Sequence, residues 1–149
     1  MIVQCLKTQS SCDPLVIPRN LQNVISETNY VMSTEWYTVT NKISGYRISQ
    51  GKKYTVYAVV AFNEQIRYLI FDDDNIPGFF PSVLFSISNS DIFLDWEVCE
   101  YDIESKILFV MGYPALCKDY SSLVGLIECQ NQHIEGLLSY KNHMNSFCF

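Results

Sequence analysis

Acidic residues are the most concentrated chemically active groups in this 149-residue sequence. Nine of its 16 Asp and Glu residues lie between Asp72 and Glu104, and this stretch contains neither Lys nor Arg. Carboxylates at such density can bind a divalent cation, act in acid–base catalysis, or form an electronegative surface for a cationic partner. The acidic residues are Asp72, Asp73, Asp74, Asp91, Asp95, Glu97, Glu100, Asp102 and Glu104.

The three consecutive acids, Asp72, Asp73 and Asp74, are the first candidates for a metal site. Successive side chains of an extended chain point in opposite directions, so three in a row do not converge on one ion. The spaced oxygen ligands and the following glycine of a calcium loop are missing. His133 and His143 are ten residues apart and near no paired cysteines, which disfavours zinc. The sequence therefore predicts no metal and no other cofactor.

Motifs for covalent or phosphate chemistry are also missing. The sequence contains no Gly-x-Ser-x-Gly, and Gly51-Lys52-Lys53 lacks the earlier glycine of a phosphate-binding loop. No cysteine has a local catalytic signature, and both histidines fit surface or packing positions. We therefore expect a protein that is not an enzyme. A hydrolase of unrecognised type would instead need a concave pocket with convergent polar groups of perturbed pKa.

An electronegative binding surface is the remaining use of the acids. Aromatic residues are interleaved with them, and aromatic side chains are frequent anchors of protein interfaces. Such a surface attracts a basic protein and repels nucleic acid. The alternative is that the acids only form a solvated face. The predicted binding residues are Asp72, Asp73, Asp74, Glu97, Glu100 and Asp102 for electrostatics, with Phe79, Phe80 and Trp96 as anchors; Leu84 and Phe85 are expected in the core.

Strand patterns in the middle of the chain and helical spacing at its end predict the elements that position these residues. We expect an α+β fold, with a small twisted antiparallel, SH3-like sheet or partly open barrel and C-terminal helices packed on it. Asp119 and Ser121-Ser122 are the candidate N-caps of the first of these helices. The predicted strands are 2–6, 53–62, 66–71, 79–87, 95–101 and 107–111, with 53–62 and 66–71 forming a hairpin, and the predicted helices are 122–130 and 131–145.

Length and composition predict one folded domain. Hydrophobic residues make up 48% of the chain, aromatic residues 14%, and the net charge is −6. Within 1–149 we expect an irregular part (1–42), a β-rich part (43–111) and a helical part (112–149). No apolar run has the ~20 residues of a membrane span, and the N-terminus does not resemble a signal peptide. Six irregularly spaced cysteines fit reduced thiols, so we expect a cytoplasmic protein without membrane association.

A resemblance to a known group covers about residues 43–140. The residues that carry it are Gly51-Lys52-Lys53-Tyr54-Thr55-Val56-Tyr57, Tyr68-Leu69-Ile70 leading into Asp72-Asp73-Asp74, Gly78-Phe79-Phe80-Pro81, Leu84-Phe85, Trp96 and Gly112-Tyr113. This pattern resembles bacterial immunity proteins of polymorphic-toxin and contact-dependent growth inhibition systems. The resemblance implies an SH3-like β-meander followed by helices. It also implies that the chain binds and neutralises a cognate basic toxin domain, expected to be a nuclease. The alternative is an intracellular SH3-like regulatory or scaffold module that binds an endogenous protein or peptide.

Overall fold

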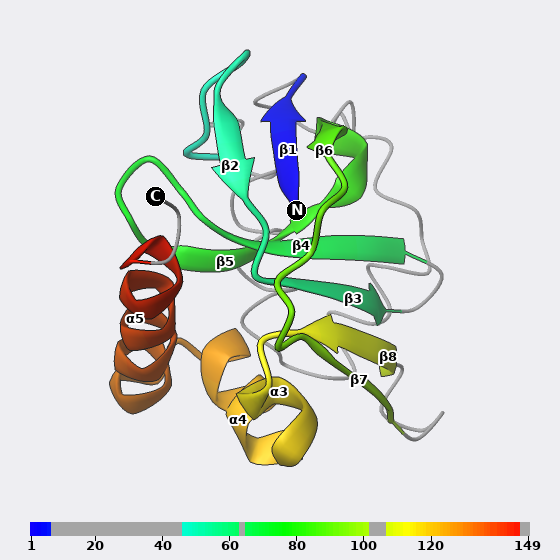
Figure 1. Cartoon of the computed structure of the whole chain (residues 1–149), viewed down its shortest axis with the longest axis vertical. Helices are drawn as coiled ribbons and strands as arrows, with labels where there is room; N and C mark the ends of the chain where they lie inside the picture. Colours follow the sequence, from blue (N-terminus) through cyan, green and yellow to red (C-terminus); the bar gives the residue numbers. More distant parts are fainter. Residues whose placement is uncertain (7–45, 63–64, 102–106, 147–149) are drawn as a thin grey trace.

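A computed structural model describes residues 1–6, 46–62, 65–101 and 107–146 (Figure 1). In the described residues the strands all lie before residue 113, and α3, α4 and α5 follow them. The α+β prediction, with antiparallel strands and C-terminal helices packed on a sheet, is confirmed. The elements are β1 (Ile2–Cys5), β2 (Lys53–Thr55), β3 (Ala58–Phe62), β4 (Gln65–Phe71), β5 (Pro77–Pro81), the 3-10 helix η2 (Ser82–Leu84), β6 (Phe85–Asn89), β7 (Glu97–Glu100), β8 (Ile107–Gly112), α3 (Ala115–Lys118), α4 (Tyr120–Ile127) and α5 (Asn131–Ser146).

The strands form two antiparallel sheets. A five-stranded sheet has the order β5-β4-β3-β8-β7, and a three-stranded sheet has the order β2-β1-β6. The predicted hairpin is present, because β3 pairs with β4 in register from Ala58 with Leu69 to Phe62 with Gln65. Pro81 lies on the edge strand β5, where the lack of an N–H donor is tolerated.

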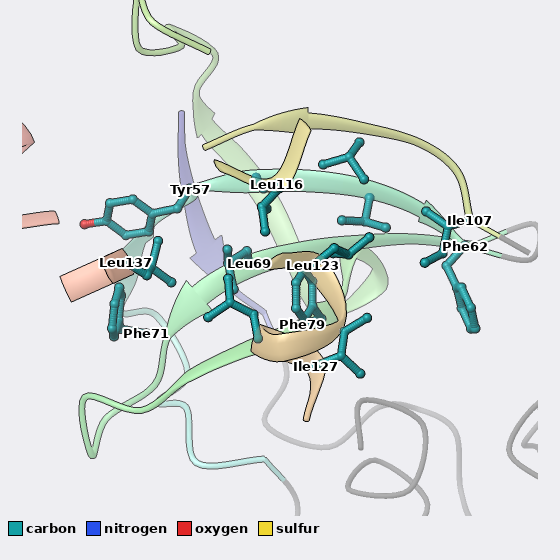
Figure 2. Close-up of a cluster of buried hydrophobic side chains, with 14 residues drawn as sticks. Tyr57, Phe62, Leu69, Phe71, Phe79, Ile107, Leu116, Leu123, Ile127 and Leu137 are labelled. Carbon is teal, nitrogen blue, oxygen red and sulfur yellow. The ribbon is translucent and has the colours of Figure 1, made fainter. Parts of the chain in front are cut away.

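The strands β3, β4 and β5 of the five-stranded sheet are covered on both faces. Alternate residues of its strands point to opposite sides, so β4 sends Leu69 and Phe71 to one core and Tyr68 and Ile70 to the other. The first core includes Leu116, Leu123 and Leu137 of the three helices, and Figure 2 shows α4 lying over the sheet there. The second core includes side chains of β1, β2 and β6. The described part of the fold therefore has three layers: helices, large sheet and small sheet.

Two segments predicted as single strands are divided between the sheets. Residues 53–62 form β2 and β3, and the chain changes sheet between Val56, whose N–H donates to Met1, and Tyr57, whose N–H donates to Leu69. Residues 79–87 likewise divide into β5, η2 and β6. Such corners allow one chain to serve two packed sheets whose strands cross. In Figure 1 the short strands β1 and β2 run crosswise to β3, β4 and β5.

Local residue types set where α4 begins and where β8 ends. Asp119 caps α4 as predicted, and its carboxylate accepts the Ser121 N–H at 2.6 Å. Gly112 ends β8 with a φ of 152°, and a Cβ there would lie 2.4 Å from Ala58 Cα, so β8 can approach β3 this closely only with glycine.

No helix in the described residues has the length and hydropathy required to cross a membrane. Most of the predicted irregular part, 1–42, lies outside the described residues, although β1 within it confirms the first predicted strand.

Candidate functional site

Asp72 builds the tight turn between β4 and β5. Its Oδ1 accepts the backbone N–H groups of Asp74 and Ile76, each at 2.9 Å. Asn75 completes the turn in the left-handed conformation, with a φ of 61°, which asparagine tolerates better than most residues. Partial burial raises the pKa of Asp72, and the two N–H donors oppose that rise. The first acid of the triplet therefore serves the backbone of its own turn.

Asp73 is bound to a segment about twenty residues earlier in the chain. It accepts hydrogen bonds from Ser49 Oγ at 2.6 Å, Lys52 Nζ at 2.5 Å and the Tyr54 hydroxyl at 2.8 Å. The bond from Lys52, followed by that from Ser49, lowers the pKa of Asp73 to about 2. In return, burial first, and the acid second, raise the pKa of Tyr54 to about 12. Asp73 is a structural acceptor that ties the turn to β2.

Asp74 forms an ion pair with Arg47, whose N–H donates to its carboxylate. Two of the three turn acids are therefore matched by a cation, and the third caps backbone donors. Exposed ion pairs of this kind contribute little to stability, but they cancel most of the local field. The acidic turn, residues 72–76, is much less electronegative than its sequence indicates.

The other acids lie on the crossover segment, which we define as residues 86–100. It comprises most of β6, the connection and β7, and it passes from the edge of the small sheet to the edge of the large one (Figure 1). Asp91, Asp95, Glu97 and Glu100 are exposed, and none forms an ion pair with a described residue. Four aliphatic side chains are exposed on the same segment: Ile87 (58%), Ile92 (49%), Leu94 (107%) and Val98 (65%).

Aromatic contacts hold the crossover segment against the body of the protein. Phe93 stacks on Tyr57 at 6.1 Å between ring centroids, and it meets Tyr140 of α5 edge-on at 6.2 Å. The Tyr140 hydroxyl also donates to Asp95 at 2.8 Å. Burial is the main reason that the pKa of Tyr140 is raised, so this donor keeps its proton. The segment therefore presents its acids and aliphatic residues from a fixed backbone rather than from a loose loop.

Two of the three predicted aromatic anchors are buried. Phe79 and Phe80 are each only 7% exposed and belong to the two different cores, so their prediction as surface anchors is wrong for this conformation. The reason is that both faces of β5 are covered. Trp96 is half-buried, packs on the second core and lies 6.3 Å from Phe93, which makes it chiefly a support of the crossover segment.

Among the predicted electrostatic residues, Glu97 and Glu100 are exposed on β7, whereas Asp102 lies outside the described residues. The prediction that Leu84 and Phe85 are core is confirmed. Sequence reasoning did not single out the exposed aliphatic residues, of which Ile87, Ile92 and Leu94 are the clearest. For Ile87 the signal is an isolated aliphatic residue flanked on both sides by serine, in Ser86-Ile87-Ser88. Ile92 and Leu94 each have an acid on one side and Phe93 on the other, so this pattern does not identify them.

The described residues contain no group of three or more His, Cys, Asp or Glu side chains placed to hold a metal ion. Cys117 lies beside Cys99, and its thiol donates to the Val110 carbonyl at 3.7 Å. Burial, followed by the hydrogen bond with Cys99, raises the pKa of Cys117 to about 12. A thiol with such a pKa is almost wholly protonated at neutral pH and is a weak nucleophile.

No protein-family model matches the chain, and neither a curated protein nor a solved structure matches it significantly. Function must therefore be inferred from the side chains themselves.

Proposed function

We propose that this chain is an immunity protein that binds and neutralises a cognate basic toxin domain through its crossover segment. The observation that carries the proposal is the exposure, on one tethered segment, of four acids without an ion pair to a described residue and four aliphatic side chains. The resemblance of residues 43–140 to toxin-immunity proteins supports the same function.

The composition of the segment suits a protein partner. Acids that form no ion pair with a described residue produce a field that accelerates association with a basic surface. Exposed aliphatic side chains then gain free energy by leaving water on contact, which slows dissociation. Interfaces commonly combine an apolar centre with a polar rim, and the crossover segment supplies both on adjacent residues.

A nuclease is the toxin class that this surface fits best. A nuclease must present cationic groups to the phosphates of its substrate, so its substrate path is electropositive. The crossover segment would bind that path or the active site and exclude nucleic acid. The proposed place of action is the cytoplasm, where a nuclease toxin meets its substrate.

The decisive experiment is co-expression of the chain in bacteria with the secreted toxin domain encoded beside its own gene. Survival of the cells supports the proposal, and death of the cells despite soluble, folded protein contradicts it. Binding of the same domain is then measured for two variants. We expect Glu97→Gln/Glu100→Gln to weaken protection and binding.

The matched control is Glu128→Gln/Glu135→Gln. Both residues are exposed, and their loss changes the net charge by the same amount, but they lie just after α4 and on α5. If both double variants weaken binding equally, only net charge matters and the crossover segment is not the site. If the chain is instead a regulatory or scaffold module, it should give no protection from the toxin. A pull-down from its own cells should then recover the same endogenous protein each time.

A further inference from the structure

A second feature of the surface lies between β2, the acidic turn and α5. It is a cleft of about 310 Å³, and none of its lining residues belongs to the crossover segment. This volume is at the lower end of the range for small-molecule pockets. Three lysines contribute to its walls, an unusual concentration in a chain with a net charge of −6. The lining residues used below are Lys52, Lys53, Phe71, Asp73, Asn75 and Lys141.

The charges in the cleft are unequally compensated. Lys52 and Asp73 neutralise each other at 2.5 Å, and Asp72 is occupied by two backbone N–H groups. Lys53 and Lys141 form no ion pair with a described acid. With Lys52 and Asp73 paired, the ammonium groups of Lys53 and Lys141 outnumber the remaining carboxylate of Asp72, so three lysines against two aspartates give the lining a net charge of +1.

Lys141 is held in place rather than free in solvent. Its ammonium group lies 4.1 Å from the centroid of the Phe71 ring and donates to Asn75 Oδ1 at 2.6 Å. An ammonium has three donors, so this geometry leaves donors for a ligand in the cleft. Partial burial lowers the pKa of Lys141, which indicates that part of its hydration has been lost. A partly dehydrated, oriented ammonium binds an anion at less cost than a fully hydrated one.

We propose that this cleft binds a small molecule through an oxyanion group, a phosphate or a carboxylate, held between Lys53 and Lys141. The oxyanion accepts hydrogen bonds from both ammonium groups, and Phe71 forms the floor beside Lys141. Charge-assisted hydrogen bonds from lysine suit either oxyanion, since lysine acts as a point charge without a fixed fork geometry. This site is independent of the proposed toxin-binding surface.

The test is a titration of the isotope-labelled protein, followed by two-dimensional NMR, with sodium phosphate, sodium acetate and sodium chloride at constant ionic strength. We expect saturable shifts of the amides of residues 52–55, 72–75 and 141 with at least one oxyanion and none with chloride. Saturation by phosphate alone assigns a phosphate ligand, and saturation by acetate alone assigns a carboxylate. Unsaturable shifts, or equal shifts with chloride, would overturn the proposal.

Two variants localise the site. Lys141→Gln and, separately, Lys53→Gln should each weaken oxyanion binding by about tenfold or more, the scale of one charge-assisted hydrogen bond. Lys118→Gln removes an equal charge from an exposed position on α3, outside the cleft, and should leave the affinity unchanged. Lys53 is exposed, so its variant tests the site even if Lys141→Gln disturbs the fold. Equal affinities for Lys53→Gln, Lys118→Gln and the unaltered protein would show that the cleft is not the site.

Discussion

The acidic turn and the crossover segment carry similar numbers of acids but use them in opposite ways. In the turn, Asp73 and Asp74 are paired with Lys52 and Arg47, and Asp72 accepts backbone donors. In the crossover segment no acid has an ion pair with a described residue. Among the described side chains, the Tyr140 hydroxyl donates to Asp95. Charge density along a sequence therefore does not measure the charge that a surface offers to a partner.

The difference follows from where the two regions lie. The turn meets the segment 47–54, whose cations and hydroxyls reach back to it. The crossover segment joins two sheet edges, and its exposed side chains face solvent. Exposed edge strands are commonly protected by charged residues, which prevent non-specific strand pairing. Protection of the β7 edge and attraction of a basic partner are compatible roles for Glu97 and Glu100.

The largest expected effect on stability is that of replacing Phe80, which lies on β5 just after the acidic turn. Phe80→Ala removes a buried ring from the second core and should lower the free energy of unfolding by about 3–5 kcal/mol. Ile92→Ala, on the exposed crossover segment, should change it by less than about 0.5 kcal/mol. Urea unfolding followed by circular dichroism measures both. A neutral Phe80→Ala would show that β5 is not covered as described and would restore Phe80 as a surface anchor.

The second largest effect on stability should distinguish Trp96, which supports the crossover segment, from the exposed side chains of that segment. Trp96→Ala should cost about 2 kcal/mol of stability, below the full cost for a buried Trp because the ring is half-buried. Leu94→Ala should leave the melting temperature unchanged, because that side chain is fully exposed. In binding to the toxin domain, Leu94→Ala should accelerate dissociation directly. Trp96→Ala should weaken binding only through its loss of stability. If Trp96→Ala melts like the unaltered protein, Trp96 is an interface residue after all.

Local patterns were sufficient to predict much of the fold. The hairpin of β3 and β4 and the Asp119 cap both depend on neighbouring residues, so they could be predicted from the sequence. The division of residues 53–62 between two sheets could not. It depends on Val56 bonding to Met1 and Tyr57 to Leu69, which are partners distant in the chain.

The same distinction explains the outcome for the candidate site. Exposure of Glu97 and Glu100 fits their place on a polar edge strand, whose residues the sequence predicted. Neutralisation of Asp73 and Asp74 depends on residues 21 to 27 positions away, and no local pattern reports such contacts. Burial of Phe79 and Phe80 has a weak local signal, since adjacent apolar residues without alternation indicate a strand covered on both faces.

A smaller effect tests whether Asp73 is structural. Asp73→Asn should lower the free energy of unfolding at neutral pH by about 1 kcal/mol, the upper end for an exposed ion pair. The folded-state pKa of Asp73 is lowered from 3.8 to about 2, so its contribution is complete above pH 3.8 and is lost as the pH falls toward 2. The difference between the two proteins should therefore shrink over that window in denaturation series. Glu97→Gln is the control, and an equal pH dependence for it would erase the distinction between turn and crossover segment.

The smallest effect on stability should accompany a clear effect on binding. Glu97→Gln/Glu100→Gln removes two exposed charges without an ion pair to a described residue, so the free energy of unfolding should change by less than about 0.5 kcal/mol. These charges act on a basic partner over a Debye length of about 10 Å at 0.1 M salt. The association rate with the toxin domain should therefore fall several-fold at low salt, while the dissociation rate changes little, because aliphatic contacts hold the formed complex. Raising the salt concentration should remove the difference between the variant and the unaltered protein.

Asp72→Asn/Asp74→Asn is the contrasting variant, because the structure already offsets much of the charge it removes. Stopped-flow association at several salt concentrations compares the two, and a larger loss of rate for the turn variant would reverse the assignment of the two regions.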